Sequence, residues 1–133
     1  MTLYVDTSAL FKKYVQERDT DVALHFLASD PVLVTSRLTE IEIRRNLARQ
    51  FSDKEHGAVR IELDRDLDGF ALVGMDAAIC NSAARVAEQT GCRSLDAIHV
   101  ASALRAGSNT TFLTFDIRQG QVARTMGLTV LGV

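Results

Sequence analysis

Three aspartates stand where apolar stretches give way to helical patterns. Asp6 and Asp116 each follow closely on an expected buried strand, and Asp96 is the only charged residue of the apolar helical stretch 95–104. Carboxylates gathered within a few ångströms repel one another, and some of them stay protonated unless a cation neutralises them. Oxygen ligands without a cluster of Cys or His suit Mg²⁺ or Mn²⁺. If these acids meet in the fold, the chemistry they favour is metal-assisted.

Each acid also has a simpler interpretation as the cap of a helix. An acidic side chain at a helix start accepts hydrogen bonds from the free backbone N–H groups and interacts favourably with the helix dipole. Asp76 has the same context, and we interpret it as a plain cap. One acid at a strand end therefore indicates little, and only convergence of several acids favours a site.

A helical stretch over residues 36–51 offers two further acids, Glu40 and Glu42. At about 100° per residue these side chains point about 200° apart, so only one of them can face a shared pocket. The apolar residues of the stretch spread too widely around the helix to choose between them. Glu40 also has Arg44 at the i+4 position for a solvated ion pair.

The elements that would position these acids alternate regularly along the chain. The expected strands span residues 3–5, 32–35, 70–73, 111–114 and 128–131, the second opening at Pro31. The expected helices span residues 8–16, 20–28, 36–51, 53–68, 76–90, 94–106 and 116–126, with Ser8, Ser36, Asp76 and Ser94 as N-caps. Short apolar strands that alternate with helices predict parallel strands covered on both faces.

The predicted fold is therefore a three-layer α/β domain, with a central parallel sheet of about five strands flanked by helices, over residues 1–133 as a single domain. In such sheets, ligands bind outside the carboxyl ends of the strands, close to the helix starts. Asp6 and Asp116 share that edge if their strands are neighbours, and a helix that starts with Asp96 can face the same crevice.

Composition sets broad limits on the function. The 133 residues are 47% hydrophobic and 24% charged, with 8 Gly and 1 Pro, which is typical of an ordered globular chain. No apolar run is long enough to span a membrane, no signal peptide is evident, and Cys80 and Cys92 lack a C-x-x-C spacing, so we expect a cytoplasmic protein with reduced thiols. The net charge of −2 neither requires nor excludes an RNA substrate.

Four segments in order carry a family resemblance: Val-Asp-Thr-Ser-Ala-Leu at 5–10, Ser-Arg-Leu-Thr-Glu-Ile-Glu-Ile-Arg-Arg at 36–45, Ser-Leu-Asp-Ala-Ile-His-Val-Ala-Ser-Ala at 94–103 and Leu-Thr-Phe-Asp at 113–116. Together they resemble the PIN-domain ribonucleases, especially the VapC-like toxins of bacterial toxin–antitoxin pairs. No single segment is specific, but four in the family's order frame the whole chain.

The resemblance implies an acidic pocket that also holds the metal. Its members would be Asp6, Glu42, Asp96 and Asp116. Glu42 is favoured over Glu40 because the family's glutamate stands three residues after the threonine matched by Thr39. The hydroxyls that would orient the acids or a water on the metal are Thr7, Ser8 and Thr114.

The implied activity is hydrolysis of RNA phosphodiester bonds with one or two Mg²⁺ or Mn²⁺ ions as cofactor. The implied partners are an RNA substrate, a cognate VapB-like antitoxin that blocks the pocket, and a second copy of the chain in a homodimer. Arg118, Arg37 and Arg45 are candidates for contacts to the substrate phosphate. His99 faces broadly the same way as Asp96 and is expected to be a packed, hydrogen-bonded histidine.

Two other functions fit parts of the pattern. An Asp-dependent phosphatase would use Asp6 as its nucleophile, but haloacid-dehalogenase-type enzymes need a second Asp where this chain has Ser8. Receiver domains need a lysine after a late strand, and none follows Lys54. A non-catalytic PIN-like module that binds RNA or protein is the other alternative, and four intact acids argue against it.

Overall fold

A computed structural model describes residues 1–29 and 32–133 of the chain, so the expected strand opening at Pro31 lies outside the described residues. The strands are β1 (Thr2–Val5), β2 (Val32–Ser36), β3 (Phe70–Val73), β4 (Thr110–Leu113) and β5 (Thr129–Leu131). The helices are α1 (Thr7–Phe11), α2 (Thr20–Ser29), α3 (Arg37–Gln50), α4 (Asp53–Leu67), α5 (Ala77–Thr90), α6 (Ser94–Arg105) and α7 (Ile117–Thr125). Within these described ranges, no helix has both the length and the apolar character that crossing a bilayer requires.

All five strands run parallel in one sheet, in the order β3-β2-β1-β4-β5. The chain therefore moves outward from β1 to β3 on one side and returns to build β4 and β5 on the other. The strand order reverses between β1 and β4, which pair with Val5 opposite Leu113. In an open α/β sheet, this switch point is where a crevice opens at the carboxyl edge.

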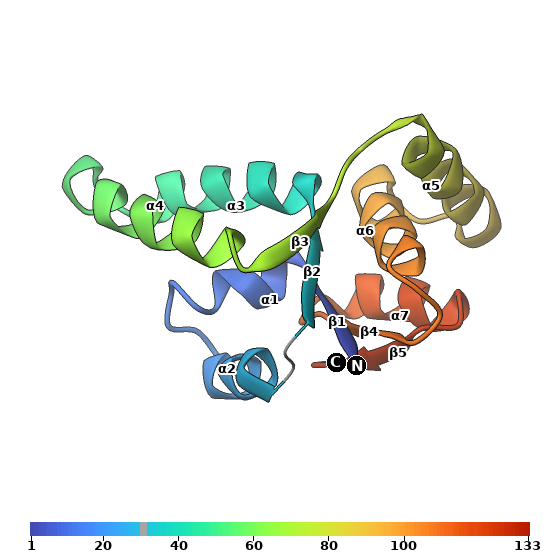
Figure 1. Ribbon diagram of the computed structural model, residues 1–133, viewed down its shortest axis with the longest axis horizontal. Helices are drawn as coiled ribbons and strands as arrows, with labels where there is room; N and C mark the ends of the chain where they lie inside the picture. Colours follow the sequence, from blue (N-terminus) through green and yellow to red (C-terminus); the bar gives the residue numbers. More distant parts are fainter. Residues whose placement is uncertain (30–31) are drawn as a thin grey trace.

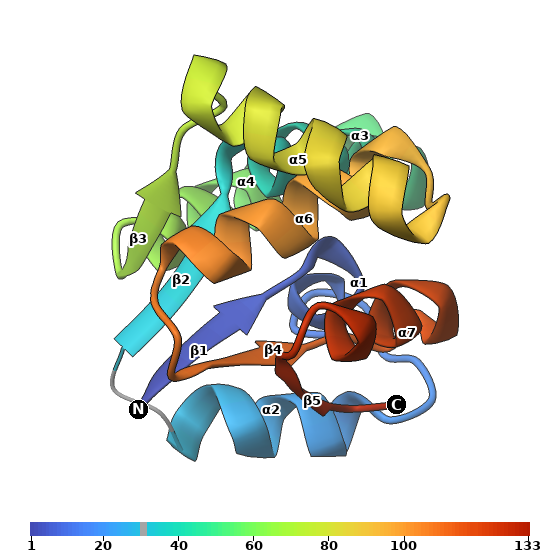
Figure 2. The same ribbon diagram turned by 90° about the vertical axis from the view of Figure 1, so that its right-hand side faces the viewer.

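Helices cover both faces of the sheet, as Figure 1 shows, with α1 to α4 on one side and α5 to α7 on the other. Alternation along β1 explains the two cores, because successive side chains of a strand point to opposite faces. Leu3 and Val5 pack into the core under α1, α3 and α4, while Tyr4 packs with Phe112 into the core under α5, α6 and α7. The predicted three-layer parallel fold is confirmed. Helix α6 lies between α5 and the sheet in Figure 2, which explains why it is apolar nearly all round.

Two of the predicted N-caps are wrong, and both errors concern the acid edge. The side chain of Asp6, not Ser8, caps α1 by accepting a hydrogen bond from the Ala9 N–H, so the helix begins at Thr7. It ends at Phe11 instead of near residue 16, since the N–H groups of Lys13 and Tyr14 bond to carbonyls three residues before them. Ser94 is the first helical residue of α6, and the cap position is held by Arg93 without a side-chain hydrogen bond. The predicted caps Ser36 and Asp76 are confirmed.

Candidate active site

A pocket of about 420 Å³ opens at the switch point between β1 and β4. It lies where β1 leads into α1, beside the first turns of α6 and α7 and the side of α3. The lining residues include all four acids of the predicted pocket and their hydroxyl neighbours: Asp6, Thr7, Ser8, Glu42, Asn46, Arg93, Ser94, Leu95, Asp96, His99, Asp116 and Gln119. Carboxylates separated by up to 110 residues in sequence therefore share one cavity.

Asp6 is the deepest of the four acids, with 1% of its surface exposed. Its Oδ1 accepts hydrogen bonds from the Ala9 N–H at 2.9 Å and from the Ser8 hydroxyl at 2.7 Å. Its Oδ2 accepts one from the Thr114 hydroxyl at 2.5 Å. The Ser8 Oγ in turn accepts a hydrogen bond from the Phe115 N–H at 2.9 Å, so the acid is fixed by the first turn of α1 and by the segment that follows β4.

Burial gives Asp6 an unusual electrostatic state. Loss of solvent raises the pKa of the carboxyl, and the charge of His99 together with hydrogen bonds from Thr114, Ala9 and Ser8 offsets this only in part. A carboxyl held at a pocket wall with a raised pKa gains most from a nearby cation, because the cation replaces the solvation that burial removed.

Asp96 and Asp116 are joined through one glutamine. Gln119 donates from its Nε2 to Oδ1 of Asp96 at 3.1 Å, and its backbone N–H donates to Oδ1 of Asp116 at 3.2 Å. Asp96 is 6% exposed, and its Oδ2 lies 3.6 Å from Nε of Arg93. Asp116 is half-buried and is also the N-cap of α7. The cap and site interpretations of Asp116 are therefore compatible, since one oxygen can cap while the side chain lines the pocket.

Glu42, not Glu40, faces the pocket. Oε1 of Glu42 accepts hydrogen bonds from the Thr7 hydroxyl and from Nε2 of His99, both at 2.7 Å. Burial alone would raise the pKa of Glu42, but the hydrogen bond and charge of His99, with the Thr7 bond, lower it below its ordinary value. Glu40 pairs instead with Arg37 at 2.9 Å on the outer side of α3.

The three predicted phosphate-binding arginines lie outside this pocket. Arg37 is engaged with Glu40, and Arg45 contacts the Asn46 side chain on the exposed side of α3. Arg118 lines a second groove of about 510 Å³ between the end of α5 and α7. That groove also contains Asp96 and Arg93, so it adjoins the acid pocket.

Six residues of the pocket wall are not assigned to the site by the sequence: Asn46, Arg93, Ser94, Leu95, His99 and Gln119. Gln119 was identifiable in principle, because it stands three residues after Asp116 and helical spacing puts the two on one face. Arg93 directly precedes the segment 94–103, in which the sequence favours Ser94 as the helix cap, so no role is predicted for Arg93. His99 is buried and hydrogen-bonded as expected, but its partner is the pocket glutamate.

The carboxylate oxygens of the pocket are ligands that suit a hard divalent cation, although the described residues do not form a ready-made cluster around one position. In residues 1–29 and 32–133, no group of three or more His, Cys, Asp or Glu side chains is close enough to form a ready-made metal site. Mg²⁺ usually takes one or two carboxylates and completes its shell with water and substrate phosphate. The buried Asp6 carboxylate and the nearly buried Asp96 carboxylate, on walls of the same pocket, meet that lesser requirement.

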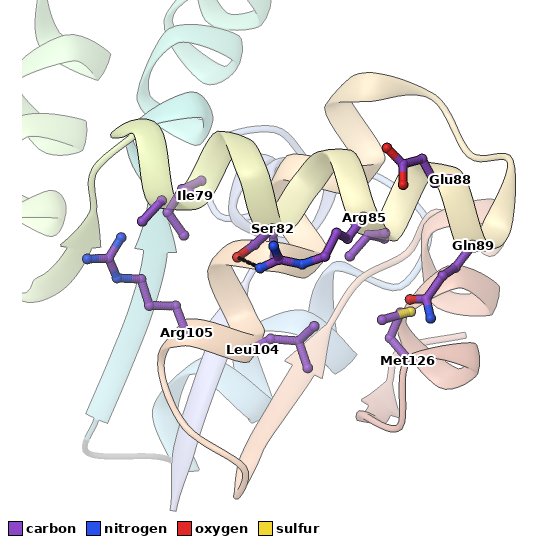
Figure 3. Close-up of a pocket in the computed structure, with 11 residues that line it drawn as sticks. Ile79, Ser82, Arg85, Glu88, Gln89, Leu104, Arg105 and Met126 are labelled. Atoms are coloured by element: carbon purple, nitrogen blue, oxygen red, sulfur yellow. Dashed lines mark hydrogen bonds between the residues drawn. The ribbon is translucent and has the colours of Figure 1, made fainter.

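The largest pocket described, of about 840 Å³, is elsewhere. Figure 3 shows it between α5 and α6, where Arg85 and Arg105 point over an apolar floor that includes Ile79 and Leu104. None of the four predicted acids lines it. Size therefore does not identify the reactive site of this molecule, and the smaller pocket holds the residues with chemistry.

Comparisons with known proteins agree with this fold. Ribonuclease VapC35 of Mycobacterium tuberculosis is 37% identical over 97% of this chain and 95% of its own length. Ribonuclease VapC46 of the same organism is 32% identical over 97% and 95%. The FitAcB structure from Neisseria gonorrhoeae matches with a TM-score of 0.78 at 19% identity over 97% of this chain and 96% of that one. M. tuberculosis VapC20, described as a sarcin-ricin loop cleaving toxin, matches with a TM-score of 0.74 at 20% identity over 98% of both chains. The PIN domain model matches residues 3–125, and the chain therefore belongs to the PIN-domain family.

Proposed function

We propose that this protein is an endoribonuclease that uses Mg²⁺ or Mn²⁺ to hydrolyse RNA phosphodiester bonds and acts as the toxin of a toxin–antitoxin pair. The observation that carries the proposal is the lining of one pocket by Asp6, Glu42, Asp96 and Asp116. Two relatives more than 30% identical over nearly the whole chain are named ribonucleases, which supports the same chemistry here.

The catalytic and metal-holding residues that we propose are these four acids. A bound divalent cation would activate water, neutralise the scissile phosphate and stabilise the leaving 3′-oxygen. Asp6 and Asp96 are the proposed direct ligands, since both are nearly buried at the pocket wall. Asp116 would hold a second ion or its water, and Glu42 would bind through water or accept a proton.

The surrounding polar residues hold the acids in place. Thr114 and Ser8 fix both oxygens of Asp6 through hydrogen bonds, and Thr7 fixes Glu42. Hydrogen bonds of this kind orient metal ligands, and their loss costs about 10–100-fold in metal affinity or activity. Gln119 plays the same part for Asp96.

Among the three candidate arginines, Arg118 is the one that we favour for contact with RNA phosphate. It is exposed and lines a groove that adjoins the acid pocket, and Arg93 lines both cavities. A guanidinium group suits the planar, bidentate recognition of phosphate oxygens. Arg37, at the start of α3, is occupied by an ion pair with Glu40, and Arg45 is on the exposed side of that helix and does not line the pocket.

The proposed partners are a VapB-like antitoxin and a second copy of the chain in a homodimer, and the proposed compartment is the cytoplasm. Structures with the same fold include "VapBC-1 from nontypeable Haemophilus influenzae" and "FitAB bound to IR36 DNA fragment", and these descriptions support the antitoxin partner. An arginine of the antitoxin that reached the carboxylates would block the cation site by charge-assisted hydrogen bonds.

The test is incubation with a panel of structured RNAs, with Mg²⁺ or Mn²⁺ and with EDTA. Wild type should cleave at discrete positions with metal and not with EDTA, and Asp96→Asn should not cleave. Asp76→Asn is the matched control, because Asp76 is an N-cap acid that lies away from the pocket. Cleavage by Asp96→Asn at the wild-type rate would remove Asp96 from the mechanism, and cleavage in EDTA would remove the metal.

A non-catalytic module remains the competing proposal, and one observation favours it: the described acids do not converge into a ready-made metal cluster. Such a module would bind RNA or a protein partner with equal affinity in Mn²⁺ and in EDTA and would leave every RNA of the panel intact. The cleavage assay separates the two proposals directly.

A further inference from the structure

A continuous chain of hydrogen bonds runs from the sheet core to the pocket glutamate. The Tyr4 hydroxyl lies 2.8 Å from Nδ1 of His99, and Nε2 of His99 lies 2.7 Å from Oε1 of Glu42. Thr7 completes the chain by donating to the same Oε1 at 2.7 Å. The four residues come from β1, α6, α3 and α1, so the chain links elements from both faces of the sheet.

The acceptor at the end of the chain fixes the direction of the bond from His99. An ionised carboxylate can only accept, so Nε2 of His99 must carry a hydrogen. Nδ1 of His99 accepts the Tyr4 hydrogen in a neutral imidazole and donates to the Tyr4 oxygen in an imidazolium, and Nε2 donates to Glu42 in both.

Tyr4 and His99 have little freedom to move. Tyr4 is 0% and His99 is 1% exposed, and the Tyr4 ring is stacked on Phe112 with centroids 5.2 Å apart and an interplanar angle of 11°. Tyr4 also meets His99 edge-on at 6.0 Å. Glu42, by contrast, keeps 26% of its side chain exposed toward the pocket.

Both bonds go to one oxygen of Glu42. No hydrogen bond to Oε2 comes from residues 1–29 or 32–133. A carboxylate held rigidly by Oε1 presents Oε2 in a fixed direction, and a group held by packed neighbours acts on a substrate or cation more effectively than a free one.

We infer that Tyr4 and His99 are positioning residues, which through their hydrogen bonds hold Glu42 in the orientation that RNA cleavage requires. This inference rests on the proposed ribonuclease function and extends it to two core residues. His99 acts through Glu42 and does not itself touch the substrate.

The sharpest test is Tyr4→Phe, which removes only the hydroxyl and keeps the ring that stacks on Phe112. We expect kcat to fall about 3–10-fold with KM within about twofold of wild type. His99→Leu should lower kcat about 10–100-fold, the range found when a supporting partner is removed. His99→Gln should recover part of this loss, since its amide offers a donor at about the reach of Nε2.

The matched control is Val86→Ala, a core truncation in α5 that does not line the acid pocket. It should lower Tm at least as much as Tyr4→Phe and leave kcat near wild type. A readout without RNA comes from two-bond ¹H–¹⁵N spectra of the histidine rings. These should show the His99 hydrogen on Nε2 in wild type, and a change of tautomer or of Nδ1 shift in Tyr4→Phe.

Three outcomes would overturn the inference. The first is a kcat equal to that of wild type in both His99→Leu and Tyr4→Phe. The second is a fall of kcat in Val86→Ala as large as in these variants when the loss of Tm is the same. A hydrogen on Nδ1 of His99 with none on Nε2 in wild type would remove the donor to Glu42 and overturn it as well. If wild type itself cleaves no RNA, the proposed function fails and the inference falls with it. An active wild type with unaffected variants removes the inference alone.

Discussion

Thr114 donates its hydroxyl hydrogen to Oδ2 of Asp6 at 2.5 Å, although 108 residues separate the two in sequence. The same Oγ1 accepts the backbone N–H of Asp116 at 3.0 Å. One hydroxyl therefore connects the acid at the end of β1 with the acid that starts α7. The acid edge depends on this bond as much as on the acids themselves.

Replacement of Thr114 by Val tests that dependence. The variant loses both hydrogen bonds in a buried place, so we expect a loss of about 1–3 kcal/mol of stability and a 10–100-fold fall in activity. Thr110→Val is the control, at the start of the strand that Thr114 follows, because the buried Thr110 Oγ1 has no hydrogen-bond partner in the described part of the chain. It should be neutral or stabilising by about 1 kcal/mol with activity unchanged. Urea unfolding and cleavage rates measure both effects, and equal behaviour of the two variants would contradict the prediction.

Asp6→Asn should abolish cleavage and yet not lower the stability of the metal-free protein. Asn is as good an N-cap as Asp, and it carries no charge into the buried site. Because the pKa of Asp6 is raised above its ordinary value of 3.8, folding favours the protonated carboxyl. The resulting penalty is absent at pH values below 3.8 and grows as the pH rises through the higher pKa of the folded state.

Because the raised pKa of Asp6 destabilises the folded state only above acid pH, the effect of Asp6→Asn on stability should depend on pH. In EDTA, the difference in Tm between Asp6→Asn and wild type should be close to zero in acid and should favour the variant at neutral pH. Calorimetry at several pH values measures the difference. A variant that is less stable than wild type at neutral pH, but not in acid, would show that the Asp6 carboxylate stabilises the fold.

Mn²⁺ should stabilise wild type more than either Asp6→Asn or Asp96→Asn. Binding to the folded state alone adds about 2.7 kcal/mol at a concentration 100 times Kd, and loss of a ligand carboxylate removes most of this gain. Asp76→Asn should respond to Mn²⁺ as wild type does, because Asp76 is fully outside the pocket and pairs with Arg105. Equal shifts of Tm in all four proteins would place the bound ion elsewhere.

Arg93→Gln and Arg118→Gln should weaken the binding of a short RNA by the inactive Asp96→Asn protein. If an arginine binds one phosphate, its replacement should reduce the slope of log K against log salt concentration by about 0.7 for a single strand. Arg85→Gln, in the pocket of Figure 3, is the charge-matched control and should leave the slope unchanged. Fluorescence anisotropy at several salt concentrations gives the slopes. If all three variants keep the slope of the parent protein, the RNA does not bind in the groove that Arg93 and Arg118 line.

The sheet and its acid edge were predictable because they rest on local patterns. Short apolar runs between helices give parallel strands, and Asp6 and Asp116 stand next to such runs. Helix caps were less predictable, since a strand-end acid and a serine two residues later compete for the same N–H groups. At the start of α1, Asp6 takes the cap and Ser8 turns its hydroxyl toward the acid.

Helical periodicity could not decide which of Glu40 and Glu42 faces the pocket. Apolar residues lie around much of α3, so the helix pattern alone gives no direction. The choice came from the family resemblance, and the pocket geometry agrees with it. The link between Glu42 and His99 was not predictable, because it depends on how α3 and α6 approach each other across 57 residues of sequence.

The position of β1 at the centre of the sheet has a consequence for synthesis of the chain. β1 is made first, yet one of its two flanking strands is β4, which ends at Leu113. A nascent chain on the ribosome cannot join the Asp6 carboxylate to the Thr114 hydroxyl until Thr114 has left the exit tunnel. This order of emergence delays assembly of the acid edge until most of the polypeptide has been made.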